Sequence, residues 1–101
     1  MQDLSSTVAM MESSDYRERF KAEYYQTKIR YEKLKAFNNK IEAADMTMYP
    51  GPICEGQYVP HKKVEMPKHD CPSHLLREQQ SIMGQYLHIL EVRAVIEGIE
   101  L

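Results

Sequence analysis

The stretch DYRERFKAEYYQTKIRYEKLKAFNNKIEA, residues 15–43, decides the fold of this chain. Neither Gly nor Pro interrupts it, and its larger apolar side chains return at steps of three, four or seven residues, as they do along one stripe of a helix. These side chains are Phe20, Tyr24, Tyr31, Leu34, Phe37 and Ile41. Ser13, Ser14 and Asp15 are good N-cap residues just ahead of it. The sequence therefore predicts one long amphipathic helix over residues 15–45.

A second helix is predicted over residues 71–97. Pro72 suits the first turn of a helix, where its missing N–H removes no hydrogen bond, and Gly98 is a typical C-terminal stop. Apolar side chains form two adjoining stripes on this helix. The first stripe is Leu76, Met83, Leu87, Leu90 and Ala94, and the second is Leu75, Ile82, Tyr86, Ile89 and Ile96. Gly84 interrupts the helix, either as a loss of helix propensity of about 1 kcal/mol or as a point where another helix approaches closely.

A long proline-rich connection, residues 46–70, joins the two predicted helices. The 5 prolines of the chain lie between residues 50 and 72, together with Gly51 and Gly56, and they forbid a continuous helix. A connection of this length is unusual in a compact domain, so we expect it to be functional or mobile. Its apolar residues allow a short β-hairpin.

These segments predict a single all-α domain, an antiparallel hairpin of two long helices. Residues 1–14 are interpreted as a flexible leader and residues 98–101 as a tail. A hairpin covers only one stripe of each helix, and a chain of 101 residues buries little surface. The second stripe and the tyrosines of the first helix then need another surface to pack on. A homo-oligomer built along the second helix is therefore predicted.

Composition and charge argue against several classes of protein. The net charge of −2 lacks the basic footprint of a protein that binds DNA or RNA polymers. No run approaches the roughly 18 apolar residues of a membrane span, and residues 1–14 lack the pattern of a secretory signal. Cys54 and Cys71 are accordingly expected to be reduced thiols in a cytosol.

No sequence pattern typical of an enzyme is present, whether nucleophile elbow, P-loop, Rossmann glycines or HExxH, so no catalytic residue is assigned. One group of residues could bind zinc, namely His61, His69, Cys71 and His74, with Cys54 upstream. It lacks the paired CxxC of structural zinc sites. The favoured interpretation is a polar loop followed by a helix start, without a metal or cofactor, and a small zinc-dependent module is the alternative.

The first predicted helix mixes aromatic, amide and basic side chains in a way that suits nucleotides. The residues concerned are Tyr24, Tyr25, Lys28, Arg30, Tyr31, Lys33, Lys35, Asn38, Asn39 and Lys40. Aromatic rings stack on bases, amides read base edges, and basic groups bind phosphates. The alternative is a set of core tyrosines flanked by solvated lysines, and composition alone favours that alternative.

Residues 16–44 and 71–101 resemble a family of small phage proteins common in gut (crAss-like) phages. The resemblance is carried by the aromatic and basic first helix and by LLREQ (75–79), MGQYLHIL (83–90) and RAVIEGI (93–99). That family is in turn similar to the phage anti-CBASS sponges, which trap cyclic oligonucleotide messengers of bacterial immunity. The resemblance implies a phage anti-defence protein in the cytoplasm of the infected host, which sequesters CBASS-type or Thoeris-type signals without cleaving them.

The resemblance also implies an assembly and a set of contacts. It implies a homo-hexamer that holds cyclic di- or trinucleotides between protomers. Tyr25 and Lys40 are the matching contacts for cyclic dinucleotides, and Tyr24 or Lys28 takes their place if the alignment shifts by one turn. Arg77 is the matching contact for cyclic trinucleotides. The connection over residues 46–70 is longer than the family's usual one.

Two other classes of function remain open from the sequence. One is a protein–protein inhibitor that docks an exposed apolar helix on a host defence enzyme. The other is a structural or accessory phage protein without a ligand. Oligomeric state discriminates sequestration from docking, because interface pockets need several copies of the chain and docking needs a free surface.

Overall fold

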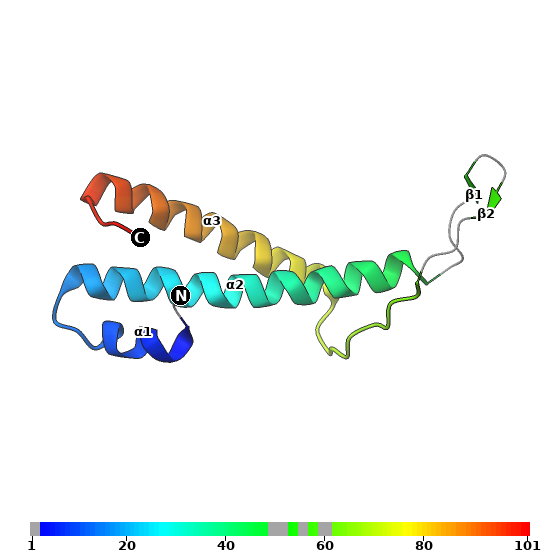
Figure 1. Ribbon diagram of the computed structural model, residues 1–101, viewed down its shortest axis with the longest axis horizontal. Helices are drawn as coiled ribbons and strands as arrows, with labels where there is room; N and C mark the ends of the chain where they lie inside the picture. The colour runs from blue at the N-terminus through cyan, green and yellow to red at the C-terminus, as the bar shows by residue number, and fades with distance from the viewer. Residues whose placement is uncertain (1–2, 49–52, 55–56, 59–61) are drawn as a thin grey trace.

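A computed structural model describes residues 3–48, 53–54, 57–58 and 62–101. In chain order the elements are α1 (Leu4–Met11), α2 (Tyr16–Met46), β1 (Ile53–Cys54), β2 (Gln57–Tyr58) and α3 (Ser73–Glu97). Helices α2 and α3 lie side by side in opposite directions, and α1 folds back along the first part of α2 (Figure 1). Three helices make up almost all of the regular structure in these ranges, which confirms the predicted all-helical architecture.

The ends of the long helices follow from their capping residues. Asp15 caps α2, and its side chain accepts a hydrogen bond from the Arg17 N–H at 3.0 Å. Gly98 ends α3 with a left-handed φ of 70°, as predicted. The start of α3 differs from the prediction, because Pro72 is the N-cap and the helix begins at Ser73. Pro72 is extended (ψ 139°), and its carbonyl accepts the first hydrogen bonds of the helix.

The core lies between α2 and the second half of α3. It is made of the buried residues Phe20, Tyr24, Leu87, Leu90, Ala94 and Ile99. The first predicted stripe of α3 therefore faces α2, as its periodicity indicated. The second stripe faces away from the core, and its larger members Leu75, Ile82, Tyr86, Ile89 and Ile96 are exposed.

The N-terminal segment corrects the sequence-based prediction. Residues 1–14 were predicted to be a flexible leader, whereas Leu4–Met11 form α1. Asp3 and Ser6 make a reciprocal capping box: the Asp3 side chain accepts from the Ser6 N–H at 2.7 Å, and the Asp3 N–H donates to Ser6 Oγ at 3.1 Å. Thr7 is fully buried and accepts a hydrogen bond from Gln26 of α2 at 2.9 Å. Capping and this polar contact together give this short segment a defined position.

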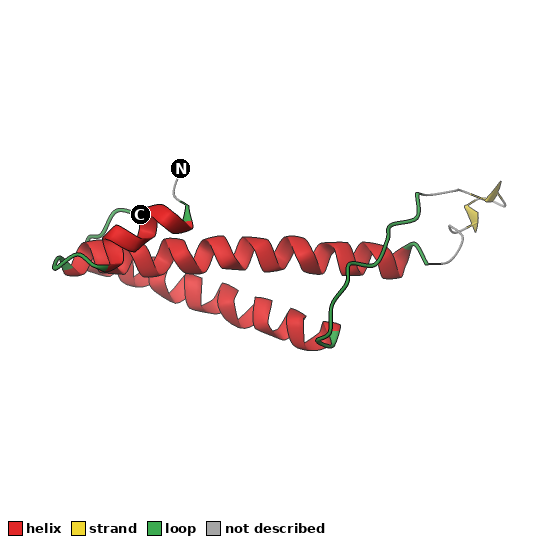
Figure 2. Cartoon of the chain, turned by 90° about the horizontal axis from the view of Figure 1, so that it is seen from below, coloured by secondary structure: helices red, strands yellow, loops and turns green. Residues whose placement is uncertain are grey.

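The described part of the connection contains the short hairpin that its apolar residues allowed. Strands β1 and β2 pair antiparallel, with Ile53 opposite Tyr58. The hairpin lies beyond the end of α2 (Figures 1 and 2), and within the described ranges it packs on none of the helices. Farther along, the Val64 N–H donates to Thr47 Oγ1 at 2.9 Å, which ties the returning chain to the end of α2.

The chain is elongated, with extents of 63 × 28 × 25 Å. Its accessible surface is 7642 Å², against about 5,900 Å² for a folded monomer of this mass. The exposed apolar stripe of α3 contributes to this excess of accessible surface. No helix in the described ranges combines the length and hydropathy that a bilayer crossing requires.

Candidate ligand-binding grooves

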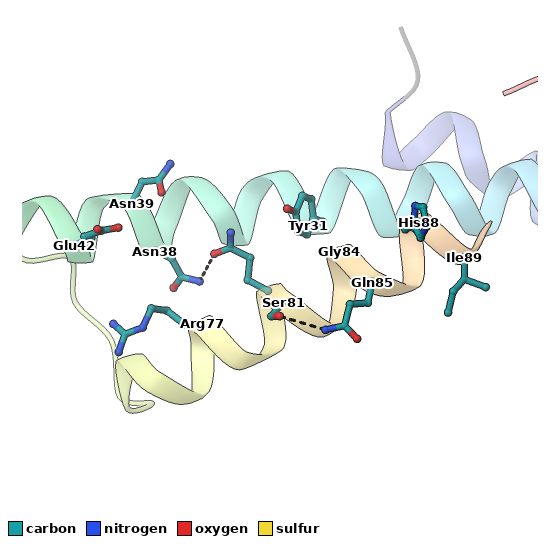
Figure 3. A pocket seen from close by; sticks show the side chains of 11 residues that line it. Tyr31, Asn38, Asn39, Glu42, Arg77, Ser81, Gly84, Gln85, His88 and Ile89 are labelled. Atoms are coloured by element: carbon teal, nitrogen blue, oxygen red, sulfur yellow. Dashed lines mark hydrogen bonds between the residues drawn. The ribbon is translucent and has the colours of Figure 1, made fainter. Parts of the chain in front are cut away.

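The first candidate site is a groove of about 880 Å³ between α2 and α3, here called the α2–α3 groove. The two helices cross at an angle (Figures 1 and 2), and in the first part of α3 polar and small residues lie beside α2 in place of the leucines of the core. The lining residues are Tyr31, Asn38, Asn39 and Glu42 of α2, with Arg77, Gln80, Ser81, Gly84, Gln85, His88 and Ile89 of α3 (Figure 3). A volume of this size lies within the usual range of small-molecule sites.

Asn38 is the buried polar residue of this groove. Its side chain is 6% exposed, and its Nδ2 donates to the Leu76 carbonyl at 3.1 Å and to Gln80 Oε1 at 2.9 Å. Its Oδ1 is buried and has no hydrogen-bond partner among the described residues. An unsatisfied buried acceptor of this kind costs about 1–3 kcal/mol. A ligand donor or a water molecule at this point would recover that free energy.

Gly84 brings α3 close to Tyr31. A Cβ at position 84 would lie 3.3 Å from Tyr31 Cε1, which is tighter than an ordinary van der Waals contact. Of the two interpretations of Gly84, close helix approach is therefore the one that the structure supports. The contact holds the half-buried Tyr31 ring at one wall of the α2–α3 groove (Figure 3).

Arg77, the predicted contact for cyclic trinucleotides, lies in the α2–α3 groove. Its side chain is exposed and forms no ion pair or hydrogen bond within the described residues. Glu42 from α2 lines the same groove and adds one negative charge. The guanidinium is thus available to an anionic ligand such as a phosphate.

The second candidate site, here called the α1–α2 groove, has a volume of about 610 Å³. It is lined by Asp3, Leu4, Tyr25, Lys28, Ile29, Glu32 and Lys33. Two predicted contacts, Tyr25 and Lys28, are therefore brought together here. The positive charge of the groove is balanced, because Lys28 and Lys33 share it with Asp3 and Glu32. The groove exists because α1 is a helix, so the prediction of a flexible leader could not reveal it.

Tyr24 is a core residue, which corrects its assignment to a ligand-binding surface. Its side chain is 5% exposed, and its hydroxyl donates to Glu91 at 2.7 Å. Burial, together with this hydrogen bond, raises the pKa of Tyr24 to about 12. The Lys28 ammonium lies 5.8 Å from the centre of its ring. For this residue the alternative interpretation, a core tyrosine beside a solvated lysine, describes the structure.

Lys40 is exposed on α2 and lines neither groove. The structure therefore does not bring the predicted pair Tyr25 and Lys40 together within one chain. They are separated by fifteen residues along a single helix, a distance of roughly 22 Å. A ligand that contacts both would need the second residue from another copy of the chain.

The residues considered for zinc do not assemble into a metal site in the described ranges. No group of three or more potential ligands occurs there. His69 Nδ1 lies 2.8 Å from the Pro67 carbonyl, its ring meets Phe37 edge-on, and Cys71 is exposed. His61 and the side chain of Cys54 lie outside the described residues.

Gln80, Ser81 and His88 line the α2–α3 groove, and the sequence patterns did not single them out. One usable signal was Asn38, which lies four residues after Leu34 and three before Ile41, on the apolar stripe of α2. A polar residue on such a stripe marks a place where the neighbouring helix must supply hydrogen bonds. No pattern in the sequence of α3 identified Leu76 and Gln80 as the hydrogen-bond partners of Asn38, because these contacts depend on how the two helices pair.

Comparison with known proteins connects the grooves to a family. No curated protein and no solved structure matches the chain. The sequence matches the Sequestin family over residues 14–50 and 59–96, which include α2 and nearly all of α3. Both walls of the α2–α3 groove lie inside the matched ranges, whereas Asp3 and Leu4 of the α1–α2 groove lie outside them. The chain therefore belongs to the Sequestin family, which confirms the predicted relationship to the anti-CBASS cyclic-oligonucleotide sponges.

Proposed function

We propose that this protein sequesters cyclic oligonucleotide immune signals, of the CBASS or Thoeris type, in the cytoplasm of a phage-infected bacterium. It binds the signal without cleaving it and is not an enzyme. The observation that carries the proposal is the α2–α3 groove, a nucleotide-sized space lined by aromatic, amide and guanidinium groups within the residues matched to the family. These are the groups with which proteins bind bases and phosphates.

In the α2–α3 groove the roles divide by chemistry. The Tyr31 ring supplies a surface for base stacking, and the amides of Asn39 and Gln85 hydrogen-bond to base edges or ribose. Arg77 binds a phosphate through paired N–H donors. Glu42 accepts from a base amino group or a ribose hydroxyl and limits the net positive charge of the site.

The α1–α2 groove is a second binding site in this proposal. Tyr25 stacks on a base, and Lys28 meets a phosphate. Because Asp3 and Glu32 offset the two lysines, long-range attraction for an anion is weak here, and affinity depends on direct contacts. Lys40 contributes from another copy of the chain.

Sequestration also requires an assembly, which we propose is a homo-hexamer built on the exposed stripe of α3. Ile96 is 78% exposed, and Ile82 and Ile89 are more than half exposed. A continuous apolar face of this kind is typical of an interface. The excess surface of one chain is about twice the roughly 800 Å² that each partner buries in a standard interface.

The same exposed stripe favours one competing function, inhibition of a host defence enzyme by helix docking. An inhibitor of that kind is monomeric or dimeric alone, leaves the stripe free, and binds no cyclic nucleotide. A structural or accessory phage protein would likewise bind no ligand.

Isothermal titration tests the proposal. The purified protein is titrated with a panel of cyclic di- and trinucleotides and cyclic ADP-ribose isomers, with light scattering on the same sample. We expect submicromolar binding of at least one signal by an oligomer, and a loss of at least tenfold in Arg77→Ala or Lys28→Ala with the oligomer intact. Gln79→Ala, an exposed change on α3 that lines neither groove, is the matched control. A monomer that binds none of the panel contradicts the proposal.

A further inference from the structure

The α2–α3 groove contains a hydrogen-bond acceptor that the protein itself leaves unused. Asn38 is almost fully buried, yet its Oδ1 has no partner among the described residues. Buried amide oxygens in folded proteins are nearly always bonded to protein, water or ligand. The exception here lies in the wall of a groove large enough for a nucleotide.

The orientation of the Asn38 amide follows from its neighbours. The Leu76 carbonyl can only accept, so the atom facing it at 3.1 Å must be the NH₂ group. The second N–H donates to Gln80 Oε1 at 2.9 Å. Both hydrogens are thus used inside the protein, and the oxygen is the only part of the amide left for another molecule. Figure 3 shows the amide directed from α2 toward α3, on the side of the groove where Arg77 lies.

We infer that the α2–α3 groove selects a nucleobase carrying an exocyclic amino group, whose N–H donates to Asn38 Oδ1. The inference rests on the proposed function and adds the identity of the recognised group. Because Asn38 offers an acceptor and no donor, it favours the exocyclic amino groups of adenine, guanine or cytosine over a carbonyl group at the same position, whose oxygen can only accept. Asn38 is therefore a specificity-determining residue.

A ligand reaches Oδ1 only if a neighbouring side chain moves, and Arg77 lines the same groove. Arg77 is exposed and forms no hydrogen bond within the described residues, so it can rotate while Gln80 keeps its hydrogen bond to Asn38 Nδ2. An Arg77 that turns to a ligand phosphate leaves space beside Asn38 for the base of the same nucleotide. Phosphate binding and base reading are then coupled within one groove.

The test uses pairs of ligands that differ only in the amino group. Cyclic di-AMP is compared with its analogue containing purine in place of adenine, and cyclic GMP-AMP with its analogue containing hypoxanthine in place of guanine. We expect the wild-type protein to bind the amino-bearing member of at least one pair about tenfold more tightly, by isothermal titration. Asn38→Ala reduces that ratio to less than twofold, whereas Gln79→Ala preserves it.

Asn38→Ser removes Oδ1 but keeps a hydroxyl that can donate to a neighbouring acceptor, and it is expected to lose the preference as Asn38→Ala does. It serves if Asn38→Ala fails to fold, because the wild type and Asn38→Ser then decide the question. Equal binding of both members of each pair by the wild type overturns the inference while leaving sequestration intact. A ratio that persists in Asn38→Ala also overturns it. Failure of every cyclic nucleotide to bind overturns the proposed function and the inference with it.

Discussion

Three tyrosine hydroxyls tie α2 to α3 by donating to carboxylates on the opposite helix. The pairs are Tyr16–Glu97, Tyr24–Glu91 and Tyr86–Glu23, at 2.7, 2.7 and 3.0 Å. Each bond needs a neutral phenol, so the pKa of each tyrosine is raised. Burial is the main cause for Tyr24 and Tyr86, and the hydrogen bond to Glu97 is the main cause for Tyr16. Tyrosine protonation is therefore linked to the pairing of the two helices.

The first prediction concerns alkaline stability. The pKa of Tyr24 rises from 10.0 in the unfolded chain to about 12 in the folded one. Its contribution is fully present below about pH 10 and is lost as the pH rises through 12, by up to about 3 kcal/mol. Urea unfolding followed by helix circular dichroism from pH 8 to 12 measures this loss. Tyr24→Phe should flatten the profile above pH 10, while Tyr25→Phe should leave it unchanged. An identical fall in Tyr24→Phe contradicts the assignment.

At the scale of the element, α1 determines whether the α1–α2 groove exists. The helix has only eight residues and few buried apolar side chains, so its position depends on the Asp3 cap and on the Thr7 contact with Gln26. Isolated helices of this length are unstable in water. The groove can therefore be removed without disturbing the pairing of α2 and α3.

The second prediction separates the Asp3 cap from the Asp3 charge. Asp3→Ala removes both the capping side chain and its charge, and should destabilise α1 by about 1 kcal/mol. Asp3→Asn removes the charge but keeps a side chain that caps a helix well. Amide hydrogen exchange should accelerate over residues 4–11 in Asp3→Ala and remain slow in Asp3→Asn, with α2 and α3 unchanged in both. Equal acceleration in the two variants contradicts the capping argument.

The third prediction concerns Gly84. Gly84→Ala gains helix propensity but moves Tyr31 by a few tenths of an ångström, so the free energy of unfolding should change by less than about 1 kcal/mol. Gly84→Leu fills the space beside Tyr31 and should weaken ligand binding at least tenfold while helix content persists. Gln79→Leu, an exposed change on the same helix, controls for added apolar surface. Full affinity in Gly84→Leu would place the ligand elsewhere.

The sequence predicts the long helices well and the grooves poorly. Pro72, Gly98 and the uninterrupted stretch from Asp15 set the helix ends to within two residues, because capping and chain-breaking are local. α1 was missed because Asp3 and Ser6 make an unusual capping box, without the usual Glu or Gln. The α2–α3 groove depends on residues far apart in sequence, such as Asn38 and Leu76, whose pairing follows from the packing of two helices.

At the scale of the whole molecule, the main feature is an apolar surface on α3 that the rest of the chain does not cover. The exposed apolar stripe runs most of the length of α3, with Leu75 near its start and Ile96 near its end. A second copy of the chain would cover it and could bring Lys40 to a groove that it does not reach within one chain.

The fourth prediction tests that assembly. A hexamer of 11.9 kDa chains has a mass of about 71 kDa by light scattering. Ile96→Asp changes a side chain that is 78% exposed in the single chain, so the fold should lose less than about 0.5 kcal/mol while the oligomer dissociates. Val8→Asp on α1 is the matched control and should leave the mass unchanged. A wild-type mass of one chain contradicts the proposed interface.

A depletion and recovery experiment shows whether the protein holds a cyclic nucleotide without altering it. Protein in molar excess is incubated with the cyclic nucleotide that it binds most tightly, free ligand is measured after filtration, and the retained fraction is denatured and analysed by chromatography. We expect free ligand to fall to a few per cent and denaturation to return all of the bound ligand as the intact cycle. Linear or hydrolysed product in the retained fraction, or free ligand that does not fall, contradicts this expectation.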